Sequence, residues 1–434
     1  MSFEQMILEK IRYRVYNIDS ILKYRMRDIY FTRERKMPFP KVVLYSLCKK
    51  GLTSKMEIFD FDEIVNTADI SSPAVLKQRE KLSAKIYEDM MDENNICFYN
   101  QFPEKVKLFK GYILAASDGC EFEIPNTILT RNKCGNYTNP AARAHVDNMY
   151  DLLNCFVLGT TVNYGKSNER AIAKENWDKV KQLNLNFPII TVRDRGYMSL
   201  KEVNQLNENK TKFVIRLDEG NYKETIAALT SNDETVEIAF RPQHIWRYKD
   251  SDPEYCKHMK TTRATTSFRM VVVELENGEK QYLATNLSPE EFTTEDIQKI
   301  YKLRWGIESS FHTLKESLKI ESITSSKDNL IKQDIYSQML AFNTIQAFVN
   351  ANNEKIDQST YKHKMKTNTN MAVGFFKKYF LYILVEEDDT KKKYLLGKLE
   401  EGIKRHIVPN RPGRKYTVNK KKHNKYPINK RKSF

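Results

Sequence analysis

The chain of 434 residues has little cysteine, and its six cysteines are scattered without a C-x-x-C pair. A disulfide framework is typical of small secreted chains, so we expect free thiols in a reducing cytoplasm. Long apolar runs are also missing, and no stretch of the sequence is apolar enough to cross a bilayer. The first residues, MSFEQMILEKIRYRV, carry charges throughout, which does not fit a signal peptide. These absences exclude a disulfide scaffold and predict a cytoplasmic protein without a membrane partner.

Acidic residues are absent from the end of the chain, between Gly402 and Phe434. The same stretch carries 12 lysine and arginine residues, which supply 12 of the formal net charge of +16. A surplus of that size implies an acidic partner, and nucleic acid is the leading candidate because the sequence lacks a membrane segment. We interpret this tail, including Arg411, Arg414 and Lys415, as an arm that contacts DNA phosphates; a solubilising tail is the alternative.

The first hundred residues have the periodicity of helices, with Ile7, Ile11, Val15 and Ile18 at helical spacing. A further helix is expected near residue 72, because Ser71 or Ser72 can cap it and Pro73 suits its first turn. Three polar side chains that lie along this helix are candidates for DNA contact: Lys77, Gln78 and Arg79. The pattern predicts a recognition helix of a helix-turn-helix unit, and the alternative is the charged face of an ordinary surface helix.

From about residue 111, short apolar strands alternate with helices, which predicts an α/β fold. Two of these strands end in an aspartate that a glycine follows closely, at Asp118 and at Asp194. The ends of strands in α/β sheets are places where sites are built, and Mg²⁺ prefers carboxylate oxygen. Each aspartate alone could equally belong to a turn or to a helix cap.

A helix expected from Thr294, its plausible cap, to about Leu318 carries the next candidate residues. At helical spacing, four polar side chains share one stripe roughly 60° wide beside the apolar face: Tyr301, Arg304, Glu308 and Lys315. A carboxylate there could bind metal, and Arg304 and Lys315 could bind phosphates. The alternative is an i,i+4 ion pair between Arg304 and Glu308 on a solvated helix.

The spacing Y-(2)-R-(3)-E-(6)-K of these four residues resembles the signature of the insertion sequence four family of DDE transposases. The blocks around Asp118 and Asp194 resemble the two acidic blocks of that family. Residues 333–336 and 411–414 also look like family features, so the resemblance covers roughly residues 110–415.

This resemblance implies an RNase H-like catalytic core that is interrupted by a mostly β insertion before the glutamate. It implies that Asp118, Asp194 and Glu308 hold two Mg²⁺ ions, which Mn²⁺ could replace, for metal-dependent DNA cleavage and strand transfer. Tyr301, Arg304 and Lys315 would position DNA phosphates. Trp246, in the insertion, could stack on a flipped base, or it could be an ordinary packed aromatic residue.

The expected partners are double-stranded DNA, as terminal inverted repeats and as target, and a second copy of the chain in the DNA complex. We expect a nucleoid-associated protein. A catalytically inactive DNA-binding relative and a structure-specific nuclease are the alternatives. The expected units are a helical N-terminal DNA-binding domain (1–108), the first part of the core (109–219), a β insertion (220–290), the second part of the core (291–350), a C-terminal helical region (351–402) and a basic tail (403–434).

Overall fold

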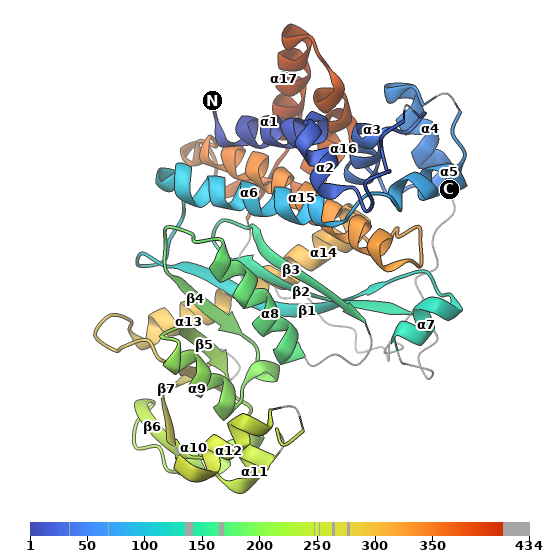
Figure 1. Ribbon diagram of the computed structural model, residues 1–434. Coiled ribbons are helices and arrows are strands. Elements are labelled where there is room, and N and C mark those ends of the chain that lie inside the picture. The colour runs from blue at the N-terminus through green and yellow to red at the C-terminus, as the bar shows by residue number, and fades with distance from the viewer. Residues whose placement is uncertain are drawn as a thin grey trace, which may run out of the picture.

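The computed structural model describes residues 1–33, 35–67, 69–134, 142–164, 169–246, 248–250, 252–262, 265–275 and 278–410. Figure 1 shows a helical layer at one end, a twisted sheet in the middle and a smaller group of helices at the opposite end. The prediction of an α/β fold is confirmed at this level. Among the described helices, none has the length and the apolar composition needed to cross a membrane.

In the part of the chain that the structure describes, eight strands form one mixed sheet in the order β3-β2-β1-β4-β5-β8-β7-β6. Strands β1, β4 and β5 are parallel, and the other neighbouring pairs are antiparallel. The strands are β1 (Ile113–Glu123), β2 (Arg143–Asp151), β3 (Val157–Tyr164), β4 (Ile189–Arg193), β5 (Lys212–Arg216), β6 (Asp233–Ala239), β7 (Thr265–Glu274) and β8 (Lys280–Thr285).

Helices cover the central strands on both faces, which is why the first five residues of β1 are all buried. The contacts of two consecutive residues of β2, Asp147 and Asn148, show that helices lie on both faces of the sheet. The amide of Asn176, in α8 (Glu169–Gln182), donates to Asp147 at 2.9 Å. The next residue, Asn148, contacts the sulfur of Met339 in α15 (Asp328–Glu354). Because successive side chains of a strand point to opposite faces, α8 and α15 lie on opposite sides of the sheet.

Among the described residues, six α-helices precede the sheet: α1 (Phe3–Tyr16), α2 (Ile18–Tyr24), α3 (Phe39–Leu47), α4 (Ser54–Val65), α5 (Ser72–Arg79) and α6 (Lys85–Gln101). Helix α1 begins with a capping box between Ser2 and Gln5. Its apolar stripe is buried as the spacing predicts, but Ile18 is 70% exposed. The stripe ends there because α1 stops at Tyr16 and α2 starts in a new direction.

The segment 220–290, expected to be a mostly β insertion, contains β6, β7 and β8 together with three short helices. These helices are α10 (Lys223–Ala227), α11 (Pro242–Trp246) and α12 (Pro253–Thr262). Strand β8 pairs with β5, so the strands of this segment extend the central sheet. The helices form the small group far from the N-terminal layer (Figure 1).

The helix expected from Thr294 to Leu318 differs in detail from the structure. Thr293, and not Thr294, caps α13 (Thr294–Leu303), because its side chain accepts from the backbone N–H of Asp296. Helix α14 (Trp305–His312) follows after Arg304, and residues Thr313–Ser317 form a π-helical turn. Such turns are rare and occur often at functional sites.

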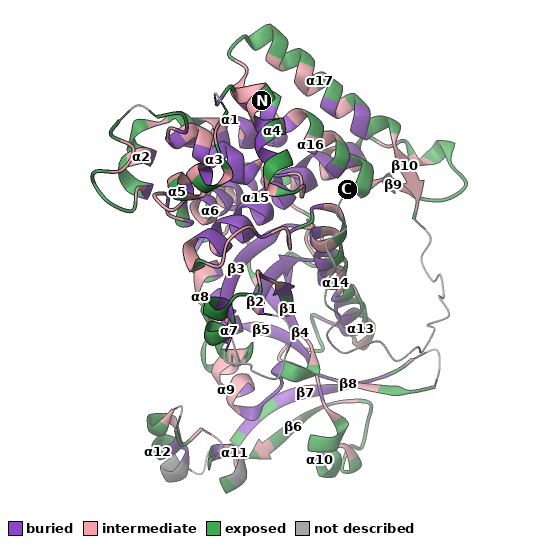
Figure 2. Ribbon diagram, turned by 90° about the vertical axis from the view of Figure 1, so that its right-hand side faces the viewer, coloured by how far each residue is buried: buried purple, intermediate pink, exposed green. Residues whose placement is uncertain are grey.

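Helix α15 is the longest described helix, and most of its residues are buried under the N-terminal layer (Figure 2). Helices α16 (Thr369–Val385) and α17 (Asp389–Arg405) and the small sheet of β9 (Met365–Thr367) and β10 (Ile407–Pro409) complete the C-terminal region. The remaining elements are α7 (Ile128–Cys134), α9 (Leu200–Glu208) and short 3-10 turns at Pro103–Lys105, Arg195–Tyr197, Glu219–Asn221 and Gln358–Thr360.

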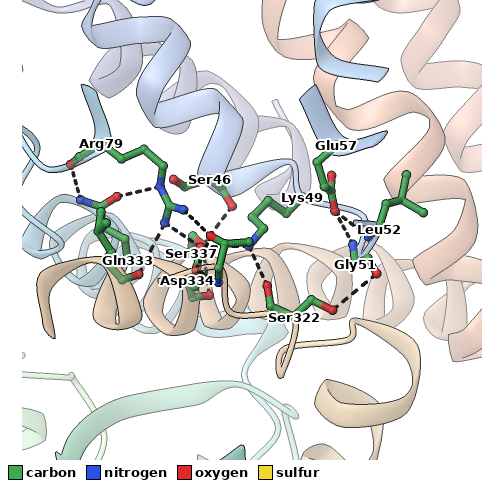
Figure 3. A network of polar contacts seen from close by, with 12 residues as sticks. Ser46, Lys49, Gly51, Leu52, Glu57, Arg79, Ser322, Gln333, Asp334 and Ser337 are labelled. Carbon is green, nitrogen blue, oxygen red and sulfur yellow. Dashed lines mark hydrogen bonds and ion pairs between the residues drawn. The ribbon is translucent and has the colours of Figure 1, made fainter. Parts of the chain in front are cut away.

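A buried polar network joins the N-terminal helices to α15 (Figure 3). The Asp334 carboxylate contacts Arg79 Nη2 at 2.6 Å and Lys49 Nζ at 3.1 Å. The amide of Gln333 donates to the backbone carbonyl oxygens of Arg79 and Leu82. Arg79 is fully buried, so the prediction that it contacts DNA is wrong. Its guanidinium neutralises a buried carboxylate on α15, 255 residues away in the sequence.

Candidate active site

Asp118 and Asp194 lie side by side at the centre of the sheet. Strands β1 and β4 are parallel neighbours, and Ser117 of β1 is in register with Arg193 of β4. Each aspartate is the next residue, so both carboxylates leave the sheet on the same face. The side chains of Ser117 and Arg193 lie on the other face and are buried.

Glu308 of α14 joins these aspartates through contacts of two neighbouring residues, Tyr301 of α13 and Arg304. Arg304 Nη2 contacts Glu308 Oε1 at 2.8 Å, and Arg304 Nη1 lies 3.8 Å from Asp118 Oδ2. The Tyr301 hydroxyl donates to Asp194 Oδ1 at 3.0 Å. The expected i,i+4 ion pair is therefore present, but Arg304 is buried and also contacts Asp118 from another element. One cluster joins the three acidic residues to Tyr301 and Arg304.

The carboxylates of the cluster influence one another electrostatically. Burial of the side chain raises the pKa of Asp118 to about 6. The Arg304 guanidinium opposes this increase, and the nearby Glu308 and Asp194 carboxylates add to it. Burial likewise raises the pKa of the Tyr301 phenol to about 12, with a further contribution from Asp194. Tyr301 is therefore a hydrogen-bond donor at neutral pH.

The donor set is suited to a hard divalent cation. The carboxylate oxygens of Asp118, Asp194 and Glu308 are the kind of ligand that Mg²⁺ prefers. Within the described ranges, no three Asp, Glu, His or Cys side chains are close enough together to hold one ion as they stand. The Arg304 guanidinium contacts both Asp118 and Glu308 and balances their charge in this arrangement.

Another buried carboxylate lies on the opposite face of the sheet from Asp118. Asp147 of β2 is in register with Gly119, and it is completely buried. Burial raises its pKa to about 7, and the hydrogen bonds from Asn176 and Tyr197 oppose that increase. A side chain at Gly119 would come within 2.6 Å of His145 Nε2, so the glycine lets the imidazole lie against β1.

Lys315, the last residue of the stripe, lies apart from the carboxylates of Asp118, Asp194 and Glu308. Its ammonium donates to the carbonyl oxygen of Glu121 at 2.7 Å and is 3.6 Å from Glu321. It is thus placed beside the distal part of β1, beyond Asp118. Arg193 balances charge inside the fold, because it is buried and forms an ion pair with Glu202.

The other DNA-binding candidates are distributed over the chain. Lys77 is exposed on α5, and the side chain of Gln78 accepts a hydrogen bond from Lys81. Trp246 is 66% exposed at the end of α11, so it is not the packed aromatic residue of the alternative interpretation. Arg411, Arg414 and Lys415 lie outside the described residues.

A groove of about 1010 Å³ opens next to Asp194, and sequence reasoning missed it. Two residues of the turn after β4, Arg195 and Gly196, line it together with residues of α9, α10 and α11. Tyr222 and Tyr248 supply aromatic surface. The lining has five basic side chains, Arg170, Arg195, Lys201, Lys223 and Arg241, against the acidic Asp218 and Glu224. The basic residues come from distant segments, so no local pattern indicated the groove.

Comparison with known proteins shows that parts of the chain are similar to transposases. Residues 130–344 match the family model described as "Transposase DDE domain". The chain is also 23% identical over 160 residues to "Probable transposase for insertion sequence element IS5377" from Geobacillus stearothermophilus. Both matches are to transposases, and each covers less than half of this chain. The matched range contains Asp194 and Glu308 and begins after Asp118.

The sequence matches to transposases cover only part of the chain, and the alignment covers only part of the curated relative. The alignment with the Geobacillus transposase spans 36% of this chain and 38% of that protein. Among solved structures, the fold is similar to a piggyBac transposase synaptic complex with hairpin DNA, with a TM-score of 0.43 and 11% identity. That similarity covers 94% of this chain and 84% of the other.

Proposed function

We propose that this protein is a cut-and-paste transposase that cleaves DNA at the terminal inverted repeats of an insertion sequence and joins the ends to target DNA. The observation that carries the proposal is the cluster in which Tyr301 and Arg304 connect Asp118, Asp194 and Glu308. The Y-(2)-R-(3)-E-(6)-K spacing favours the insertion sequence four family. The fold we propose for the core is RNase H-like, with the segment 220–290 as its insertion.

Asp118, Asp194 and Glu308 are the residues that would hold Mg²⁺, with Mn²⁺ as a substitute. When bound, such ions activate water or a DNA 3′-hydroxyl as nucleophile and stabilise the leaving oxygen. The protein's own groups place the DNA: Arg304 has an unpartnered buried Nε, and Tyr301 is a phenol donor beside Asp194. In the proposed complex both residues would donate hydrogen bonds to phosphate oxygens at the carboxylates.

The path of the DNA follows from the distribution of charge. We propose that the strand next to the cleavage point continues into the groove beside Asp194, because its lining is net basic and includes tyrosines. Along this path exposed Trp246, which lies between the lining residues His244 and Tyr248 in the sequence, would stack on a base. Lys77 and Gln78 on α5 and the basic tail would contact DNA further away. Two copies of the chain would pair the two ends.

Replacing groove cations is expected to weaken DNA binding without changing sequence preference, because they would contact phosphates. Arg195→Ala and Lys223→Ala each remove one exposed positive charge. The slope of log affinity against log salt concentration should fall by about 1 for each charge. Fluorescence anisotropy with a labelled duplex measures this slope. Lys391→Ala, exposed on α17 at the other end of the molecule, is the control, and an unchanged slope in the groove variants would contradict the path (Figure 1).

A cleavage and strand-transfer assay tests the proposed function and separates it from its alternatives. The full-length protein is incubated with DNA that carries the terminal repeats, in Mg²⁺, in Mn²⁺ or in EDTA. Metal-dependent cutting at the repeat ends with joined product supports a transposase. Cutting without joining indicates a nuclease, and binding without cutting in either metal indicates a DNA-binding relative; both overturn the proposal.

A further inference from the structure

The segment Ser317–Thr324 links the two elements that carry Glu308 and Asp118. It continues directly from α14 through the π-helical turn. Within it, the Glu321 carboxylate accepts from the backbone N–H of Glu123 in β1 at 2.9 Å. Lys315, which lies just before this segment, donates to the carbonyl oxygen of Glu121 in the same strand. The position of this segment therefore affects the distance between the Glu308 helix and the strand of Asp118.

Lys377 of α16 holds the beginning of the segment. Its ammonium donates to the carbonyl oxygens of Ser317 and Lys50, both at 2.8 Å, and lies 3.5 Å from that of Leu318. Ser317 is the last residue of the π-helical turn, so its carbonyl belongs to the negative end of the helix. A positive charge at that end stabilises the helix.

Two further cations hold the rest of the segment from the N-terminal side (Figure 3). Lys49 Nζ donates to the carbonyl oxygen of Ser322 at 2.8 Å. Arg79 Nη1 donates to the Thr324 hydroxyl at 3.1 Å. The Asp334 carboxylate contacts both cations and accepts from the backbone N–H of Thr324. The segment is thus attached to α5, α15, α16 and the loop after α3, all of which lie outside the sheet.

A close backbone approach fixes the same segment sterically. Gly51 has a φ of +89°, and a Cβ atom there would come within 2.5 Å of Lys319 Cβ. The Glu57 carboxylate accepts from the backbone N–H groups of Gly51 and Leu52 and holds this loop against Lys319. A loop held in this way cannot follow the segment if the segment moves.

We propose that Lys377 is a positioning residue, which fixes the end of the Glu308 helix so that Glu308 faces Asp118 and Asp194. Lys377 differs from Lys49 and Arg79 because its hydrogen bonds go to backbone carbonyl oxygens and not to Asp334. Its effect on DNA cleavage rests on the proposed function, whereas its effect on the helix does not.

The charge of Lys377 is sensitive to pH. Burial lowers the pKa of its ammonium to about 8, Glu57 of α4 opposes this change, and Lys319 adds to it. As the pH rises through about 8, the amine becomes neutral and the carbonyl oxygens lose the positive charge. An arginine at this position would stay charged, because its pKa is above about 12.

Lys377→Met should lower the cleavage rate on the order of 10- to 100-fold, because small displacements of a reacting group cost that much. DNA affinity should not change, since Lys377 is remote from the groove. Lys377→Arg should restore cutting, and its rate relative to the wild type should increase as the pH rises through about 8. Lys378→Met, at the exposed neighbouring position, is the matched control. Normal cutting by Lys377→Met, no rescue by arginine or a ratio independent of pH would overturn the proposal.

Hydrogen exchange on the same full-length variants distinguishes failure of this inference from failure of the proposed function. Amides of residues 305–318 should exchange faster in Lys377→Met than in Lys378→Met, with the sheet amides unchanged. If the wild type cuts no DNA, exchange alone decides: faster exchange in that helix supports the positioning role, and equal exchange in the two variants overturns it.

Discussion

Glu308→Gln is expected to reduce DNA cleavage on the order of a thousandfold or more while leaving the fold intact. The substitution removes one of three carboxylates that would hold metal, and metal coordination supplies several kcal/mol of transition-state stabilisation. The fold should survive because the glutamine carbonyl can still accept the hydrogen bond that Arg304 donates to Glu308. Single-turnover cleavage of DNA bearing the terminal repeats measures the loss.

Glu295→Gln is the matched control for this experiment. Glu295 is a glutamate in the first turn of α13, away from Glu308 in α14, and its side chain is exposed to solvent. Its substitution should leave cleavage unchanged. A Glu308→Gln protein that cuts at the wild-type rate would remove Glu308 from the catalytic assignment, while equal losses in both variants would indicate general damage to the helix.

Asp334→Ala is expected to lower the free energy of unfolding by about 3–5 kcal/mol, the largest stability effect we foresee for one residue. Lys49 and Arg79 would remain buried without their shared carboxylate. Burial alone would raise the pKa of Asp334, but the charges of Arg79 and Lys49 hold it below its ordinary value. Because its pKa is lowered, the Asp334 carboxylate contributes its full stabilisation at pH values above the ordinary pKa of aspartate. This stabilisation is lost as the pH falls through the pKa of Asp334 in the folded protein.

Urea denaturation near neutral pH and at acidic pH tests both parts of this expectation. The difference between the wild type and Asp334→Ala should shrink at acidic pH, where the wild-type carboxylate also becomes protonated. Asp328→Ala, at the start of the same helix, should cost less than about 1 kcal/mol, because its ion pair with Lys332 is partly exposed. Equal losses for the two variants would contradict a special role for the buried network.

Apolar runs and helical spacing were sufficient to predict the centre of the candidate site. Asp118 and Asp194 follow apolar runs typical of buried parallel strands, and β1 and β4 are parallel neighbours. The prediction that Asp118 ends its strand is wrong, because β1 continues to Glu123 in its pairing with β2. Arg304 and Glu308 are one helical turn apart, so their contact could be predicted before the fold was known. The α/β class follows from the same alternation of strands and helices.

Long-range partners account for what the sequence could not predict. Arg79 looks like a DNA contact because the polar residues around it resemble a surface helix, and its partner Asp334 lies 255 residues away. The groove beside Asp194 combines side chains of the core with side chains of the 220–290 segment. Lys377 lies in an apolar helix without any local pattern that indicates what it contacts. Local periodicity predicts which face is buried but not which element covers it.

The buried network also constrains the order in which the molecule can be completed during synthesis. Residues 1–108 contribute Lys49 and Arg79, whose counter-charge is on α15 and emerges from the ribosome only after most of the chain. Until then the N-terminal helices would have to bury two uncompensated charges, which is costly. These helices therefore depend on α15 to fold, and a chain truncated before residue 334 would keep neither its N-terminal layer nor the helix that carries Glu308 in place. Completion of the fold therefore waits for the last third of the polypeptide.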